Sequence, residues 1–332
     1  MQQALFETVP APMPPLPPIQ RWWRLQGQAR RAGRRVEPLL VTPRFMARID
    51  AGTCPVTREL LRPRSAVVVA LRADAAVAAG HLATLGAVAA AAASDAAGGG
   101  RWVDAWAVAQ RLTAEPTPGT HADMDAAAWR RLAVLRSFVQ PLTPAEAGML
   151  PLLALPTNRL RVLSPVQGLQ VAATLALRGA DRSVRLVQLA ALAGTEDTRL
   201  AMRVFVLTLV ARCPAGLDSM APAEARQALE DLWTDPLLQR RWQRLALRLS
   251  DAEAESLLLR ARAARLFGKG WRPLDAGFAV DGWELPAATG SESRHAPRPT
   301  PAPFPHHLVG PVLAAGRRRH GADAGVEAAV GR

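Results

Sequence analysis

The sequence predicts a mainly α-helical protein: a multi-helix domain, a small α+β patch near the N-terminus, and disordered termini. Three observations support this prediction. Apolar residues between 125 and 285 recur with the period of a helix, interrupted by short breakers. Several of these segments start with a capping residue followed by proline or by a capping box. Only one short β-branched run stands out before them, and the chain ends are rich in proline, glycine and alanine.

The helix starts are the clearest local signals. Thr143–Glu146, Ser164–Gln167 and Ser250–Glu253 each follow the capping-box pattern, in which two side chains satisfy the free backbone N–H groups of a first turn. Asp235 followed by Pro236 predicts a further helix. The apolar face of that helix is formed by Leu238, Trp242, Leu245 and Leu249.

Some segments require a choice between strand and helix. Ser65–Leu71 is short, β-branched and follows a proline, so we expect a strand. An alanine-rich helix should follow from about Leu82 to Ala93, before the glycines at 98–100. Val204–Val210 could be a buried strand, but its apolar flanks extend the run beyond strand length, so we prefer a helix.

Composition changes along the chain predict five parts. The ends lack the apolar content that a core requires, and the segment from Thr113 to Met124 carries two prolines and a glycine. The parts are a disordered proline-rich leader (1–20), a basic head with the α+β region (21–112), a linker (113–124), a helical domain (125–285) and a disordered tail (286–332).

The first residues do not have the basic-then-apolar pattern of a signal peptide. The least polar long run, Ala75–Ala93, is mostly alanine and contains His81, and it falls short of a membrane span. Cys54 and Cys213 cannot form a disulfide framework. We therefore expect a cytoplasmic protein with no membrane association.

Charge is distributed unevenly. The chain has a net charge of +13, and residues 1–72 hold twelve arginines against four acidic residues, a net charge of +8. An excess of this kind favours polyanionic partners through counterion release and long-range attraction.

The segment Arg21–Arg48 concentrates that charge, with eight arginines opposed only by Glu37. Arginine forks bind phosphates in a bidentate manner, and a neighbouring tryptophan can stack on bases. The alternative is that the tryptophans anchor an amphipathic helix and the arginines are solvated. The candidate nucleic-acid-binding residues are Arg21, Trp22, Trp23, Arg24, Arg30, Arg31, Arg34 and Arg35.

A second arginine row, Arg240, Arg244 and Arg248, lies at helical spacing beside the apolar face of its helix. Such a row is typical of a solvated surface. We expect the acidic residues of the preceding helix, Glu224, Glu230 and Asp231, to pair with it.

Residues 43–93 follow a recognisable order: the turn Cys54–Thr57, the apolar strand, a loop that contains Arg72, Asp74, Gly80 and Leu82, and a helix. This order resembles the core of HNH-type endonucleases, especially phage and mobile-element versions. The resemblance implies a nuclease scaffold and an origin in a mobile element.

The resemblance is to a degenerate copy. The family's strand carries a histidine or aspartate that activates water and helps to hold a divalent metal, whereas this strand is wholly apolar. His81 stands where the family has asparagine, and the turn lacks a second cysteine. One cysteine, one histidine and one aspartate cannot complete a metal site, so we predict no metal, no cofactor and no catalytic residues.

Two functions remain open. The first is a non-enzymatic, nucleic-acid-associated accessory protein that binds DNA or RNA through its arginine-rich N-terminal segment. The second is a helical protein–protein interaction module with no nucleic-acid role, whose partner is another protein. An active metal-dependent nuclease is disfavoured by the missing ligands. The sequence leaves the oligomeric state open.

Overall fold

The computed structural model describes residues 18–49, 51–62, 66–94, 100–179, 181–267, 271–273 and 277–280. The expected disordered tail and most of the expected leader lie outside these residues. Residues 18–20, which were assigned to the leader, instead form the start of the first helix.

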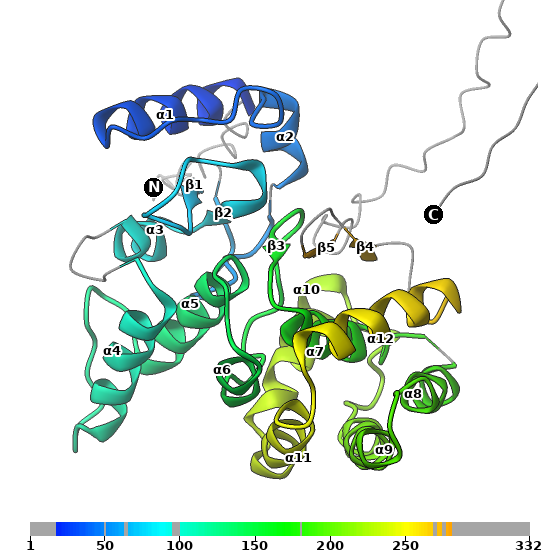
Figure 1. The fold of residues 1–332 in the computed structure, drawn as a ribbon. Coiled ribbons are helices and arrows are strands. Elements are labelled where there is room, and N and C mark those ends of the chain that lie inside the picture. The colour runs from blue at the N-terminus through cyan, green and yellow to red at the C-terminus, as the bar shows by residue number, and fades with distance from the viewer. Residues whose placement is uncertain are drawn as a thin grey trace, which may run out of the picture. The chain divides into compact units, whose positions relative to one another are not determined.

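The mainly helical fold is confirmed, with twelve α-helices and five short strands in the described part of the chain (Figure 1). The helices are α1 (Pro18–Arg31), α2 (Pro43–Arg48), α3 (Ala87–Ser94), α4 (Trp102–Ala114), α5 (Ala126–Phe138), α6 (Pro144–Met149), α7 (Pro165–Leu175), α8 (Arg182–Ala191), α9 (Glu196–Ala211), α10 (Pro222–Asp231), α11 (Pro236–Ala246) and α12 (Asp251–Ala263). The strands are β1 (Val67–Ala70), β2 (Leu82–Leu85), β3 (Arg161–Val162), β4 (Trp271–Pro273) and β5 (Phe278–Val280). Short 3-10 turns occupy Ala79–His81 and Leu232–Thr234.

Residues 18–94 are called the head from here on, in place of the range 21–112 expected for the basic head. They contain the expected strand and a second strand that was not expected. β1 pairs antiparallel with β2, so that Val67 lies opposite Leu85 and Ala70 opposite Leu82. The prediction of a helix from Leu82 was therefore wrong for its first residues, because Leu82–Leu85 form a strand and α3 begins only at Ala87. All four β2 side chains are buried, and this burial on both faces favours a paired strand over an exposed alanine-rich helix.

The two faces of this hairpin serve different cores. Val68 and Leu82 pack with α1 and α2 in a small cluster that includes Leu25 and Met46. Alternate residues such as Val69 and Leu85 face the main core. This alternation is the period of a β-strand, and it places α1 and α2 over one side of the hairpin.

Local signals placed the helix starts correctly. Thr143 with Glu146 and Ser250 with Glu253 form complete capping boxes, and Asp235 caps α11 through the N–H groups of Leu237 and Leu238. Ser164 accepts from the N–H of Gln167, but the Gln167 amide turns away and donates to the Ser137 hydroxyl. The ambiguous run Val204–Val210 lies within α9, so the preference for a helix is confirmed.

The expected linker, residues 113–124, overlaps the end of α4 at Thr113 and Ala114, and its remainder leads to α5, which packs against α4. One hydrophobic core runs from Cys54 in the head through α4 and α5 to Val280. The described residues on the two sides of this segment therefore share a single core.

Three aromatic side chains form the centre of the helical part. Phe205 of α9 lies 5.2 Å from Trp242 of α11 between ring centroids, and Trp233 lies 6.0 Å from Trp242 in an edge-on arrangement. Each indole also has a hydrogen-bond partner, since Trp233 donates to the Thr174 hydroxyl and Trp242 to the Ala147 carbonyl. This satisfies the polar end of side chains that are otherwise fully buried.

A buried ion network ties the head to α10. Glu230 is 1% exposed, and its carboxylate accepts from Arg226 Nε at 2.8 Å and from the Leu155 N–H at 2.9 Å. Arg58 of the head reaches the same carboxylate at 3.3 Å and Asp231 at 2.6 Å.

The pairing expected between α10 and the arginine row of α11 was therefore wrong. Glu230 and Asp231 are engaged by Arg58, and Arg248 lies 2.8 Å from Asp197 of α9 instead. Glu224 accepts from the N–H of Ala221 at the start of its own helix.

We predict that Glu230→Ala lowers the free energy of unfolding by about 3–5 kcal/mol, because it removes the buried carboxylate that pairs with both Arg226 and Arg58. Urea denaturation followed by tryptophan fluorescence measures this loss. Glu255→Ala, which removes an exposed carboxylate from α12, is the matched control and should stay within about 0.5 kcal/mol of the parent. Equal stability of the two variants would contradict the role assigned to Glu230.

Candidate nucleic-acid interface

Helix α1 has one buried and one exposed face. Arg21, Leu25 and Ala29 are buried at a spacing of four residues. Since successive residues turn by about 100° around a helix, the opposite side carries the residues we call the basic face. The basic face consists of the exposed side chains of Trp23, Arg24, Arg30 and Arg31.

The two tryptophans have different surroundings. Trp22 is partly buried, packs against the small core of the head, and donates its indole N–H to the Val41 carbonyl at 2.7 Å. Trp23 is 58% exposed, and its ring meets that of Trp22 edge-on with 5.0 Å between centroids. Trp22 therefore anchors α1, and Trp23 presents a free ring surface within the basic face.

Arg34 is also turned inward. Its guanidinium donates to the carbonyls of Ala75 and Arg72, which lie in the loop after β1. Burial lowers the pKa of Arg34, with partial opposition from the charge of Asp74. Arg34 thus closes this loop onto the end of α1.

The structure accordingly divides the eight candidate residues. Arg21, Trp22 and Arg34 are buried or hold intramolecular contacts. The exposed members are Trp23, Arg24, Arg30, Arg31 and Arg35. The helical spacing of Arg21 with Leu25 and Ala29 is the sequence signal that could have placed Arg21 on the buried side.

Glu37, the single acidic residue of the segment Arg21–Arg48, does not neutralise the basic face. The Glu37 carboxylate accepts from the backbone N–H of Ala79 at 3.0 Å, on the 3-10 turn before β2. α1 itself contains no acidic residue. Within the described part of the chain, no carboxylate forms an ion pair with Arg24, Arg30 or Arg31.

Sequence reasoning did not single out a second group of arginines. Arg44 and Arg48 lie one turn apart on α2 and are exposed. Together with Arg159 and Arg161 they line a pocket between α2, the turn Ala79–His81 and β5. No sequence signal links these residues, because the pocket joins segments more than one hundred positions apart.

The region that resembles HNH endonucleases has its polar groups engaged within the chain. Cys54 is buried, and its sulfur accepts from the N–H groups of Thr57 and Gly86 at 3.5 and 3.3 Å. Asp74 forms an ion pair with Arg72 at 2.8 Å. Among the described residues, no three histidine, cysteine, aspartate or glutamate side chains are grouped closely enough to hold a metal ion.

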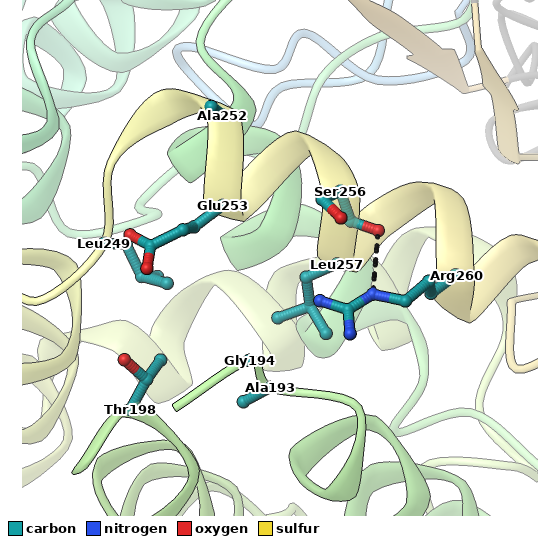
Figure 2. Close-up of a pocket in the computed structure, with 9 residues that line it drawn as sticks. All are labelled: Ala193, Gly194, Thr198, Leu249, Ala252, Glu253, Ser256, Leu257 and Arg260. Carbon is teal, nitrogen blue, oxygen red and sulfur yellow. Dashed lines mark hydrogen bonds between the residues drawn. The ribbon is translucent and has the colours of Figure 1, made fainter. Parts of the chain in front are cut away.

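A further pocket lies between α12 and the connection from α8 to α9 (Figure 2). Its polar groups stabilise α12 itself, since Glu253 accepts from Ser250 and Arg260 donates to the Ser256 carbonyl. Leu249 and Leu257 supply much of the remaining lining. This pocket gathers no set of catalytic side chains.

Comparisons with protein-family models, with curated proteins and with solved structures found no match. The resemblance of residues 43–93 to HNH endonucleases therefore stays a prediction. Within the described residues, every helix is too short or too polar to cross a membrane.

His81 gives the head a predicted pH dependence. Burial lowers the pKa of its imidazole, the charges of Arg72 and Arg161 lower it further, and Asp74 opposes them. Between this lowered pKa and the unfolded value of about 6.5, only the unfolded chain binds the proton. Stability is therefore complete above about pH 6.5 and falls as the pH drops toward the folded pKa.

Urea unfolding measured from pH 7.5 to 5 tests this expectation. His81→Asn should flatten the decline over that range. His121→Asn, at an exposed position, is the control and should retain it. An unchanged pH profile in His81→Asn would show that other groups cause the decline.

Proposed function

We propose that this protein is a non-enzymatic accessory protein that binds nucleic acid through the basic face of α1. The observation that carries the proposal is an exposed indole among three exposed arginines on a helix without acidic residues. Guanidinium groups bind phosphates irrespective of sequence, and an exposed indole stacks on any base. This combination favours single-stranded over double-stranded partners, because bases in a duplex are already stacked.

Arg35 extends the positive charge beyond the end of α1, and it is exposed like the arginines of the basic face. The resemblance of residues 43–93 to a nuclease core is consistent with this proposal. A protein that retains a nuclease scaffold without its ligands could still engage nucleic acid through surfaces outside the former catalytic centre.

Removing the exposed arginines should weaken binding and reduce its salt dependence. We predict that replacing Arg24, Arg30, Arg31 and Arg35 by alanine lowers the slope of log affinity against log salt by about 0.7–0.9 for each phosphate that the protein no longer neutralises. The loss should be similar for unrelated sequences. Fluorescence anisotropy with single-stranded and duplex oligonucleotides over a range of salt concentrations measures both quantities.

A control variant removes the same charge from elsewhere. Arg203, Arg240, Arg244 and Arg262 are exposed on α9, α11 and α12, and their replacement by alanine should change the slope far less. The proposal would be contradicted by a basic-face variant that binds as tightly as the parent, with the same slope of log affinity against log salt.

The two tryptophans provide an independent test. We predict that Trp23→Ala weakens single-strand binding by about 1–3 kcal/mol without lowering the unfolding midpoint. Trp22→Ala should instead reduce stability, by less than the roughly 3–5 kcal/mol of a fully buried tryptophan. Loss of stability in Trp23→Ala with unchanged affinity would reverse these assignments.

The alternative function, a helical protein–protein interaction module, is favoured by exposed aliphatic side chains on α8 and α9. Val184 and Val187 are about half exposed on α8, as are Leu200 and Leu207 on α9. Absence of nucleic-acid binding even at low salt would support this alternative.

A further inference from the structure

The pocket lined by Arg44, Arg48, Arg159 and Arg161 is separate from the basic face of α1. Its walls come from α2 and the preceding loop on one side, and from the segment 159–161 and Ala279 on the other. Leu40 and Phe45 give it an apolar wall. We call it the arginine pocket.

The described lining of the arginine pocket carries positive charge and no negative charge. None of its described lining residues is acidic. No described carboxylate lies within ion-pair distance of Arg44, Arg48 or Arg161. Like charges that are gathered in one concave site raise its free energy, and a bound anion relieves this repulsion.

Arg161 is fixed in the wall of the pocket. Its Nε atom is buried and makes no hydrogen bond within the described part of the chain. The side chain itself is held in place against Gly80, where an added Cβ would lie 3.0 Å from the Arg161 Cβ.

The backbone that carries this arginine is fixed. Arg161 pairs with Ala279 in the β3–β5 ladder. Two residues earlier, Arg159 adopts a left-handed conformation with φ of 66°, and its N–H donates to the Val280 carbonyl at 2.8 Å. On the opposite wall, Arg44 and Arg48 are separated by one turn of α2. Arginines therefore line the pocket from two separate segments of the chain, and guanidinium groups are suited to binding the oxygens of a phosphate.

We infer that the arginine pocket binds a phosphomonoester dianion that bears an aromatic or apolar group, of which a nucleoside monophosphate is an example. Arg44, Arg48 and Arg161 hold the phosphate oxygens, and Leu40 with Phe45 contacts the attached group. The same chemistry occurs in a free nucleotide and at the 5′-phosphate end of a nucleic-acid strand. The inference does not depend on binding by the basic face.

Isothermal titration calorimetry of the full chain with adenosine 5′-monophosphate, and with adenosine as the uncharged probe, tests this site. The monophosphate should bind and raise the unfolding midpoint, and adenosine should bind at least 10-fold more weakly. The double variant Arg44→Ala/Arg48→Ala should lose at least 10-fold in affinity for the monophosphate. Both side chains are exposed, so this variant should fold as the parent does.

Two further variants separate this site from the proposed nucleic-acid interface. Arg161→Gln should also lose at least 10-fold, because it removes a positive charge from the wall of the pocket. The quadruple alanine variant of Arg24, Arg30, Arg31 and Arg35 should bind the monophosphate as the parent does. That result would hold even if the basic face failed to bind nucleic acid.

Oligonucleotides with and without a 5′-phosphate distinguish the two sources. Tighter binding of the phosphorylated strand that is abolished in Arg44→Ala/Arg48→Ala supports a strand end as occupant. An equal affinity of both strands, with retained monophosphate binding, supports a free nucleotide. The inference is overturned if neither the monophosphate nor the phosphorylated strand uses the pocket, or if Arg44→Ala/Arg48→Ala and Arg161→Gln bind the monophosphate like the parent.

Discussion

One buried carboxylate fixes the head to the helical part of the molecule. Glu230 receives Arg226 from its own helix, the Leu155 N–H from the segment before β3, and Arg58 from the head. A carboxylate removed from water is stabilised by hydrogen bonds and by opposite charge, and these three partners supply both. The network therefore fixes the Arg58 turn and the Leu155 segment relative to α10. That segment leads within a few residues to Arg159 and Arg161. The network therefore helps to position one wall of the arginine pocket.

Arginine serves two purposes in this chain. Several guanidinium groups satisfy backbone carbonyls in the interior, as Arg34 does for Ala75 and Arg136 does for Ala93. These side chains use the five donors of the guanidinium to close loops, which a lysine could do less completely. The net charge of +13 therefore overstates the charge that is available to a partner. The charge that the two proposed binding sites would use includes that of the exposed arginines on α1 and α2.

Local chemistry made most helices predictable, and non-local contacts explain what was missed. Capping residues such as Thr143 and Ser250 act within four positions, so the sequence reveals them directly. β2 is a strand because β1 lies beside it, a pairing that local propensity cannot show. The same holds for the candidate site. Arg34 is not available to a partner because it donates to backbone carbonyls about forty positions away. By contrast, the exposure of Trp23 follows from its place opposite Leu25 and Ala29 on α1.

The head has an apolar centre around β1 and positively charged groups on its surface. Where an HNH-type enzyme would need polar ligands, β1 has only apolar side chains, and these are divided between two hydrophobic cores. Introducing a charged ligand there would bury an ion without a partner, so the strand is restricted to packing. The positive groups that remain accessible lie outside this centre, on α1, α2 and the pocket between α2 and β5. The basic face and the arginine pocket are therefore two separate places at which positive charge is accessible to a partner.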